Sequence, residues 1–341
     1  MDANHPTVEC HDPNDIEENK DLTPIRRHVV DHSLLEPFHY IHSVPGKDVR
    51  GALIDCFQFW FRVPDASILH AIKDIIGDLH NASLLIDDIE DNSKLRRGIP
   101  VAHSIFGIPS TINCANYVYF LALEKCQALN QPRATQIFVQ ELLNLHRGQG
   151  YDILWRDMIR CPTESEYLSM VCDKTGGLFR LAVGMIQTFA TQHCTDDFTK
   201  LVNDMAMYFQ IRDDFINLAD EEYMKSKSFC EDITEGKFSF PIVHAITNES
   251  KHTQLISILK QRTTDDDVKR YAQSLLKDMG SLDYTRQKCT ALKDEIVTEV
   301  NKFGGNPQLL LLFDRLHLQL EQMTTTRNTI TENNSYNIDE P

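Results

Sequence analysis

The sequence predicts an all-α protein. Apolar residues recur at steps of three and four, for example at Ile68, Ile72, Ile75 and Leu79, which is the spacing of one helix face. The 14 glycines and 13 prolines mostly fall between such stretches, and alternating strand patterns are scarce. We therefore expect helices joined by short turns that contain Gly or Pro.

Gly and Pro clusters mark the expected helix boundaries. After Pro162, the residues Thr163 and Glu166 form the pattern of a capping box, so a helix should begin there. The long apolar stretch that contains Ile68 and Leu79 should form one helix and end before Gly98. The expected breaks lie at residues 44–46, 98–100, 107–109, 161–163 and 304–307.

One domain accounts for most of the 341 residues. No linker or low-complexity stretch interrupts the helical pattern between residues 31 and 321, so we predict that the domain spans 31–321. Residues 1–30 are polar and acidic, and residues 322–341 are polar and rich in Thr and Asn. Neither tail has a hydrophobic period, and we expect both to be disordered.

Composition and charge exclude several classes of protein. A net charge of -16 is unfavourable for nucleic-acid binding, and no apolar run is long enough to form a transmembrane segment. The nine cysteines are scattered and never spaced Cys-x-x-Cys, which argues against a disulfide framework or a zinc site. Residues 1–30 do not have the pattern of a signal or transit peptide, so the predicted location is cytoplasmic.

A stripe of polar residues runs along the helix expected before Gly98. His80, Ser83, Asp87 and Asp91 follow steps of three, four and four, so they share one face. Their neighbours are apolar almost all round, which predicts a central helix. Two carboxylates one turn apart repel each other, and bound Mg²⁺ would relieve this repulsion. For this motif alone, a solvated acidic helix end is the alternative explanation.

A second acidic segment favours the metal interpretation. Gln210, Asp213, Asp214 and Asn217 again form one helical stripe between apolar flanks. Two apolar helices that each present oxygen donors one turn apart predict a shared metal cluster on facing helices.

Cationic residues lie near both motifs and near glycine breaks, although the chain is acidic overall. Each one alone is more readily explained as a surface cation. As a set they suit anionic ligands, and arginine binds phosphate through two parallel N–H groups, so they predict pockets for more than one diphosphate. The set comprises Lys47, Arg50, Arg96, Arg97, Lys174, Lys227 and Lys237.

Six segments closely resemble those of eukaryotic geranylgeranyl diphosphate synthases, a branch of the trans-prenyltransferases. The resemblance runs from about Leu34 to Leu318 and does not cover the tails. It implies a single-domain isoprenoid synthase fold, in which helices surround a central apolar cavity with the two acidic motifs at its mouth. The six segments are 46–50, 79–98, 148–152, 174–177, 209–214 and 229–241.

The resemblance also implies roles for individual residues. Two or three Mg²⁺ ions would be held by Asp87, Asp91 and Asp213, which with Lys174 and Lys227 would be the catalytic residues. Asp152 would support the cluster, and Asn217 stands where many relatives have Asp. The isopentenyl diphosphate pocket corresponds to Gly46, Lys47, Arg50, His80 and Arg97. The allylic diphosphate pocket corresponds to Arg96, Lys174, Thr175, Gln210, Lys227 and Lys237.

The implied reaction condenses isopentenyl diphosphate with dimethylallyl, geranyl or farnesyl diphosphate. The small residues Ala82 and Ser83 would leave the cavity open where farnesyl diphosphate synthases close it with aromatic side chains. A deeper floor at Tyr119, Phe120 and His146 would then set a C20 product, although ordinary core packing is an alternative role for these three residues. The family forms homodimers or assemblies of dimers, so we expect at least a dimer.

Three other functions remain open. A terpene synthase derived from this scaffold would not need the isopentenyl diphosphate pocket, yet that pocket is complete in the sequence. A non-catalytic partner subunit usually has a damaged acidic motif, and both motifs are intact. A shorter-chain geranyl or farnesyl diphosphate synthase would differ only in the depth of its cavity.

Overall fold

The computed structural model describes residues 32–44, 46, 49–219, 229–248, 252–318 and 320. The predicted tails, Lys47 and Lys227 lie outside the described residues. Residues 31 and 321 do so as well, and the domain boundaries therefore stay predictions.

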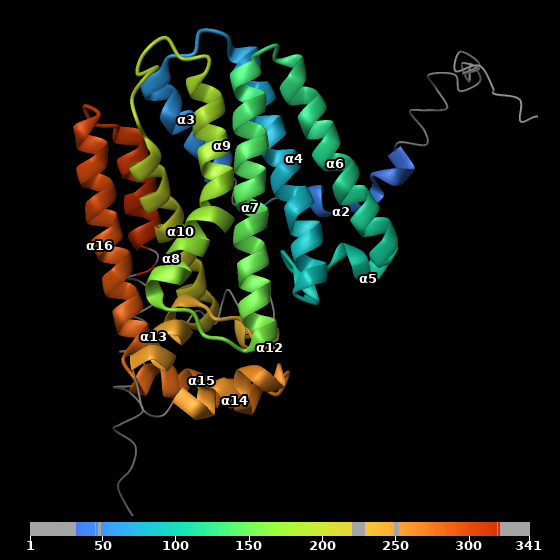
Figure 1. The fold of residues 1–341 in the computed structure, drawn as a ribbon, viewed down its shortest axis with the longest axis vertical. Coiled ribbons are helices and arrows are strands. Elements are labelled where there is room, and N and C mark those ends of the chain that lie inside the picture. Colours follow the sequence, from blue (N-terminus) through green and yellow to red (C-terminus); the bar gives the residue numbers. More distant parts are fainter. Residues whose placement is uncertain are drawn as a thin grey trace, which may run out of the picture.

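The described part of the chain is almost entirely helical, which confirms the all-α prediction (Figure 1). Its strands are the two-residue β1 (Leu95–Arg96) and β2 (Ile99–Pro100), which pair antiparallel with Leu95 opposite Pro100. The first helices are α2 (Glu36–His42), α3 (Val49–Phe61), α4 (Ala66–Glu90), α5 (Ala102–Phe106), α6 (Ile108–Ala128), α7 (Pro132–Met158) and α8 (Glu164–Lys174). The later helices are α9 (Gly176–Gln187), α10 (Thr199–Ala219), α12 (Glu231–Glu235), α13 (Phe240–Asn248), α14 (His252–Gln261), α15 (Asp266–Asp278) and α16 (Ser281–Lys302), and residues 307–318 are also helical.

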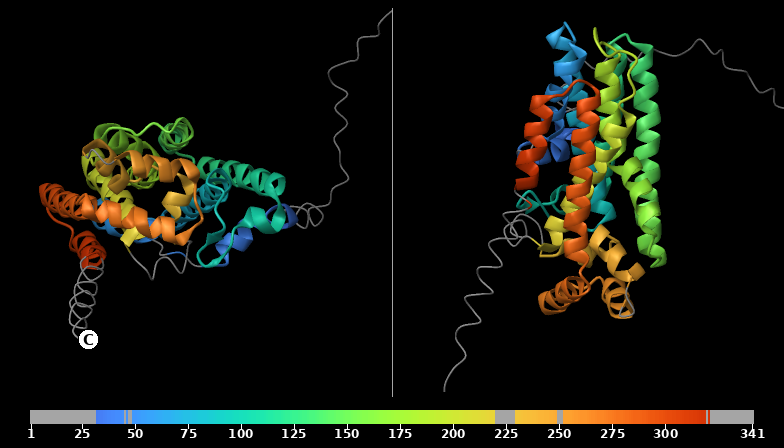
Figure 2. Two further views of the ribbon diagram at one scale, coloured as in Figure 1. Left: turned by 90° about the horizontal axis from the view of Figure 1, so that it is seen from below. Right: turned by 90° about the vertical axis from the view of Figure 1, so that its left-hand side faces the viewer.

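The long helices stand side by side as a bundle. In Figure 1, α4, α6, α7 and α9 run roughly along the long axis of the molecule, and α16 flanks α10. The shorter helices α14 and α15 lie across one end of the bundle, as both Figure 1 and the right-hand view of Figure 2 show. None of the described helices is long and apolar enough to cross a membrane.

Local sequence signals explain where the helices begin. Asp65 caps α4 by accepting a hydrogen bond from the Ser67 N–H at 2.8 Å. Thr163 and Glu166 form the predicted capping box at the start of α8. Between α5 and α6 the chain turns at Gly107, whose φ of 82° is readily adopted by glycine and rarely by other residues. The breaks expected at 107–109 and 161–163 are therefore confirmed.

Helix α4 is central, as its apolar pattern predicts. Ile72, Ile75 and Leu79 are buried in the main core, and burial of each such side chain contributes about 1.5–3 kcal/mol of hydrophobic free energy. Ala82 and Leu85 belong to a second, smaller core formed mainly with α2, α5 and α6. Because α4 is fixed along its length by both cores, the acidic residues at its C-terminal end have a defined position.

Candidate active site

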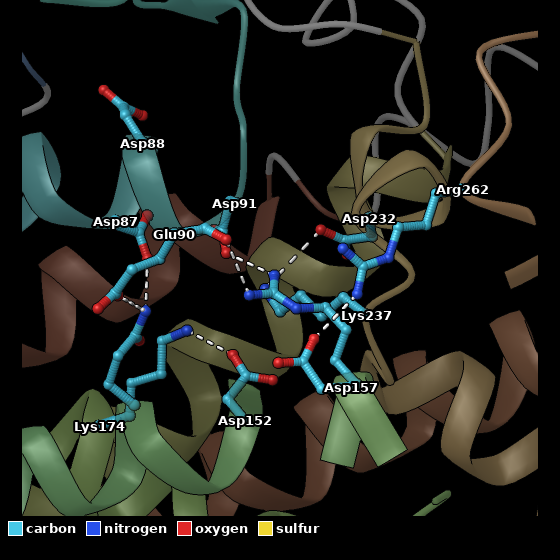
Figure 3. A network of polar contacts seen from close by, with 12 residues as sticks. Asp87, Asp88, Glu90, Asp91, Asp152, Asp157, Lys174, Asp232, Lys237 and Arg262 are labelled. Atoms are coloured by element: carbon cyan, nitrogen blue, oxygen red, sulfur yellow. Dashed lines mark hydrogen bonds and ion pairs between the residues drawn. The ribbon is translucent and has the colours of Figure 1, made fainter. Parts of the chain in front are cut away.

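The acidic motif occupies the last turn of α4. Asp91 is the residue that follows the helix, and its N–H donates to the Asp87 carbonyl at 2.9 Å, so Asp87 and Asp91 keep the predicted one-turn spacing. Figure 3 shows Asp88 pointing away from the side on which Asp91, Asp152 and Lys174 lie. The adjacent carboxylates of Asp87 and Asp88 therefore lie on different sides of α4.

Arg96 holds the motif from the β hairpin. Its Nε donates to Asp88 Oδ1 at 2.7 Å, and its Nη2 lies 3.2 Å from Asp87 Oδ2. Burial alone would lower the pKa of Arg96, but Asp88 and Asp87 outweigh this effect and raise it. Arg96 was predicted in the allylic pocket; in this structure its partners are the two motif carboxylates.

A polar stripe on α7 faces the same motif. Gln149, Asp152 and Arg156 follow steps of three and four. The Gln149 amide donates to Glu90 Oε2 at 2.7 Å and to Asp87 Oδ1 at 3.2 Å. Arg156 Nη1 lies 2.5 Å from Asp91 Oδ1. The C-terminal parts of α4 and α7 are thus joined through polar side chains.

Lys174, at the end of α8, lies against this stripe. Its Nζ is 2.5 Å from Asp152 Oδ2 (Figure 3). Burial alone would lower the pKa of Lys174, but Asp152 and then Asp87 raise it. Burial alone would likewise raise the pKa of Asp152, but Lys174 and Lys237 lower it. At neutral pH the lysine is therefore cationic and the aspartate is ionised.

In the second motif, on α10, the two neighbouring aspartates again point in different directions. Asp214 is fully buried, where it accepts hydrogen bonds from the Phe240 N–H at 2.7 Å, from the Gln210 amide at 2.8 Å and from the Tyr167 hydroxyl. Asp213 is half-buried on another face of α10. Asp214 thus joins α8, α10 and α13, while Asp213 is the better placed of the two for a ligand.

Other predicted allylic-pocket residues gather around Asp214. Lys237 Nζ lies 3.9 Å from Asp214 Oδ1 and 3.8 Å from Asp232 Oδ1. Thr175 donates to Gln210 Oε1 at 2.8 Å, and Gln210 in turn donates to Asp214. The structure therefore joins Thr175, Gln210 and Lys237 through Asp214, while Lys174 pairs with Asp152, on which Lys237 also acts electrostatically.

Asn217, the last residue of the second motif, is buried. Its side-chain oxygen accepts a hydrogen bond from the Asp232 N–H at 3.2 Å, which fixes the start of α12. In this structure Asn217 has a structural contact where the sequence motif suggested a weak metal ligand.

A second group of cations surrounds His80. Arg50 Nη1 lies 3.1 Å from His80 Nε2. Burial, followed by Arg50, Arg97 and Arg96, holds the pKa of His80 well below its ordinary value, so the imidazole is neutral at pH 7. Arg50 and Arg97 close to a neutral histidine make a cationic environment that suits a second anion, while Arg96 is paired with Asp87 and Asp88.

Arg97 fixes the edge of this pocket. Its Nη1 donates to the Val44 carbonyl at 2.6 Å and to the Ile41 carbonyl at 3.1 Å, and its Nη2 lies 3.3 Å from Asn81 Oδ1. A Cβ at Gly46 would lie 2.9 Å from Arg97 Nη2, so glycine leaves room for the guanidinium. Gly46 and Arg97, predicted to share a pocket, do lie together.

The residues predicted to set chain length are not all together. Ala82 is fully buried, and Ser83 is half-buried with its hydroxyl donating to the His80 carbonyl at 2.8 Å. Tyr119 is half-buried, and its ring centroid is 5.9 Å from that of His146, which is itself exposed. Burial, Glu90 and Asp87 raise the pKa of Tyr119, which places its hydroxyl near the first motif.

Phe120 lies at the surface of this chain, and its role in a cavity floor stays a prediction. Its side chain is 70% exposed, so it does not line the interior of this chain. Consecutive residues of a helix point about 100° apart, and here Tyr119 is half-buried whereas Phe120 is exposed. Of the three residues proposed for the floor, Tyr119 is the one that the chain itself buries in part.

The donor set fits Mg²⁺. Burial, and then Asp87, raise the pKa of Asp91, whereas Lys174 and Arg156 lower it, so additional positive charge beside Asp87 and Asp91 would favour their ionised forms. Within the described ranges, no three His, Cys, Asp or Glu side chains are grouped closely enough to hold an ion by themselves. Mg²⁺ normally takes one or two carboxylates and completes its shell with water and substrate phosphate. Asp87 and Asp91, one turn apart, could supply such carboxylates from α4, and the half-buried Asp213 could supply one from α10.

Two residues of the site were missed from the sequence. Arg156 lies four residues after Asp152, so the one-turn spacing used for α4 would have found it on α7. Tyr167 reaches Asp214 from α8, and no local pattern indicates a contact between residues so distant in sequence.

Comparison with known proteins gives consistent results. The family model described as polyprenyl synthetase matches residues 31–276. A geranylgeranyl pyrophosphate synthase from Dictyostelium discoideum is 54% identical over 286 residues, which are 84% of this chain and 93% of the relative. A protein of the same name from Mucor circinelloides f. lusitanicus is 50% identical over 81% of this chain and 90% of its own length. A terpene synthase from Matsumurasca onukii is 52% identical over 84% of this chain and 94% of its own length.

Proposed function

Because the chain belongs to the polyprenyl synthetase family, we propose that it is a trans-prenyltransferase that condenses isopentenyl diphosphate with an allylic diphosphate to give geranylgeranyl diphosphate. One observation of the structure supports this most strongly: cations gather in two places. Lys174 and Lys237 lie along the acidic network, and Arg50 lies with His80. A reaction between two diphosphates needs two such pockets.

The first group binds and orients the allylic diphosphate. Lys174 and Lys237 are held as cations by buried carboxylates, so their charge is in place before the substrate arrives. Positive charge that is fixed in advance stabilises negative charge as it develops on the departing diphosphate. Asp87, Asp91 and Asp213 would hold Mg²⁺ there, and Mg²⁺ supplies further positive charge to the leaving group.

The second group binds isopentenyl diphosphate. Arg50 offers two parallel N–H donors to a phosphate, and neutral His80 can hydrogen-bond to it or to Arg50. In the reaction the double bond of isopentenyl diphosphate attacks the allylic carbon as its C–O bond to diphosphate breaks. A proton then leaves the new chain. Apolar surroundings exclude water, which would otherwise capture the allylic cation.

The C20 product follows from the size of the side chains below the first motif. In this proposal the small Ala82 and Ser83 would leave space for a chain of farnesyl length, and the half-buried Tyr119 would be its floor. Each additional carbon buried contributes about 0.8 kcal/mol, so binding favours elongation until a side chain blocks it.

Product analysis tests the proposed function. The protein is incubated with Mg²⁺, labelled isopentenyl diphosphate and farnesyl diphosphate, and the dephosphorylated products are separated by chromatography. We expect labelled geranylgeraniol. Labelled farnesol from a geranyl starter, with none of the longer alcohol, would indicate a shorter-chain synthase, and no incorporation of label would overturn the proposal.

A second candidate function is that of a terpene synthase, because a relative of that name from Matsumurasca onukii is 52% identical to this chain. Such an enzyme would convert the allylic diphosphate to an unlabelled hydrocarbon or alcohol. The contact between Arg50 and His80 favours the synthase, because an enzyme that ionises one diphosphate needs no second cationic pocket. The same chromatogram separates the two functions.

We also propose a homodimer, located in the cytoplasm. Large apolar side chains are exposed along the neighbouring helices α6 and α7: Ile112, Phe120, Val139, Leu143, Leu154 and Met158. Exposed apolar stripes of this kind favour self-association. Leu143→Glu should convert the dimer to monomer in sedimentation experiments, whereas Leu311→Glu, at a similarly exposed leucine in the helical residues 307–318, should not. A monomeric unsubstituted protein would contradict the proposal.

A further inference from the structure

Arg156 is a buried arginine of α7 that contacts the C-terminal end of α4. It projects from the last turns of α7 and is 6% exposed. Its Nη1 lies 2.5 Å from Asp91 Oδ1, and its Nη2 donates to the Glu90 carbonyl at 3.1 Å. One guanidinium thus fixes both the carboxylate of Asp91 and the C-terminal end of α4.

The surroundings keep this arginine charged. Burial alone would lower the pKa of Arg156, but Asp91 outweighs it and raises the pKa, and Asp152 and Glu235 contribute in the same direction. Lys174 also acts on Asp91, and Asp87 opposes its ionisation from one turn away. Arg156 thus provides a positive charge in direct contact with Asp91.

Arg156 differs in position from the other arginines of the site. Arg50 and Arg97 lie near His80, and Arg96 reaches the motif from the hairpin on the side of Asp88. Arg156 instead approaches from α7 and contacts Asp91, which is one of the three proposed metal ligands. A fixed positive charge at 2.5 Å from that carboxylate repels a second cation, and this repulsion is strong where water is largely excluded.

We propose that Arg156 is a positioning residue that takes the place of a metal ion at Asp91 and so makes Mg²⁺ uptake dependent on diphosphate. In the ligand-free enzyme its guanidinium neutralises Asp91 and opposes Mg²⁺ binding. The negative charge of an arriving diphosphate would offset this repulsion, and Asp91 would then be available to help hold the ion. The inference rests on the proposed function only for the identity of the diphosphate.

The test measures binding of Mg²⁺ alone to the full-length protein by calorimetry, and thermal unfolding with and without MgCl₂. Arg156→Gln removes the charge, and Arg156→Lys keeps it. Arg262→Gln is the matched control, because Arg262 pairs at 3.0 Å with Asp157, the residue next to Arg156, on the exposed surface. We expect Arg156→Gln to bind Mg²⁺ at least about tenfold more tightly than the unsubstituted protein does. The Mg²⁺ affinities of Arg156→Lys and Arg262→Gln should differ from that of the unsubstituted protein by less than about threefold.

Thermal unfolding keeps the test decisive if Arg156→Gln is unstable. Without Arg156 the charge of Asp91 is buried and uncompensated, which is strongly destabilising. Mg²⁺ should therefore raise the Tm of Arg156→Gln far more than that of the unsubstituted protein or of Arg262→Gln. A Tm lowered equally with and without Mg²⁺, or an unchanged Mg²⁺ affinity, would overturn the proposal and leave Arg156 a structural residue.

The Mg²⁺-binding and unfolding measurements are independent of the proposed function. Neither measurement uses isopentenyl diphosphate or requires product formation. If the unsubstituted enzyme incorporates no label while Arg156→Gln gains Mg²⁺ affinity, the proposed function fails and the role of Arg156 stands. If the label is incorporated and the Mg²⁺ affinity is unchanged, only the role of Arg156 fails.

Discussion

Gly148 of α7 lies directly against Lys174 at the end of α8: a Cβ on Gly148 would be 2.3 Å from the Lys174 backbone nitrogen. The same stretch of α7 supplies Asp152, which binds the Lys174 ammonium at 2.5 Å. The absence of a side chain at one position of α7 thus lets the ion pair form one turn further along the helix.

Gly148→Ala should weaken binding of the allylic substrate. The methyl group would push Lys174 away from Asp152, and overpacking of this kind costs about 1–3 kcal/mol. We expect the KM for farnesyl diphosphate to rise about tenfold in steady-state kinetics, with a smaller change in the KM for isopentenyl diphosphate. Gly150→Ala is the control, since a Cβ there meets nothing within 4 Å, and it should behave like the unsubstituted enzyme. Equal effects of the two substitutions would contradict the positioning role of Gly148.

The two cationic groups should be separable by kinetics. Arg50→Ala should mainly raise the KM for isopentenyl diphosphate, because Arg50 contacts His80 of the proposed isopentenyl diphosphate pocket. Lys174→Ala should mainly affect the allylic substrate, since Lys174 lies beside Asp152. KM values for both substrates, measured with the other at saturation, check this. If both variants weakened both substrates equally, the assignment of the pockets would be wrong.

Stability should fall in mild acid because of His80. Its pKa in the folded chain is well below the ordinary 6.5, first through burial and then through Arg50 and Arg97. Between these two pKa values the unfolded chain binds a proton that the folded chain does not. The free energy of unfolding therefore decreases as the pH falls below about 6.5, by up to about 1.4 kcal/mol per pH unit. His80→Gln should lose less stability between pH 7 and pH 5 in denaturant titrations, and an identical loss would rule out this contribution.

Ser83→Phe should shorten the product. Ser83 projects from α4 one turn before Asp87, where a growing chain has to pass, and a rigid ring would leave too little room for a farnesyl tail. The variant should accumulate farnesyl diphosphate from a geranyl starter. Conversely, Tyr119→Ala should allow some product beyond C20. A Ser83→Phe enzyme that still makes mostly C20 would place the cavity on another face of α4.

Periodicity and composition were sufficient to predict the all-α fold and the acidic stripe on α4. The spacing of Asp87 and Asp91 is local, so it could be read directly from the sequence. The sequence could not show which aspartate of each pair makes contacts inside the protein. The partner of Asp88 is Arg96 and the partner of Asp214 is Tyr167, and both come from other elements.

Contacts between distant segments account for the remaining differences. The resemblance placed Arg97 in a substrate pocket, but its hydrogen bonds to the Ile41 and Val44 carbonyls depend on how α2 packs. Phe120 is 70% exposed in this chain, and its part in the cavity floor stays a prediction. Exposure of one helix position depends on which neighbouring elements cover it, and the spacing along one helix does not reveal this.

The most direct test of the account is the initial rate at which labelled isopentenyl diphosphate enters a C20 product in the unsubstituted enzyme, Asp87→Ala and Asp213→Ala. The account predicts that the unsubstituted enzyme is active with Mg²⁺ and inactive in excess chelator. Each substitution should lower the rate by at least about a hundredfold, which is the effect of losing one strong electrostatic group. A full rate in excess chelator, or full activity in either variant, would contradict the claim that the two acidic helices act together on a diphosphate.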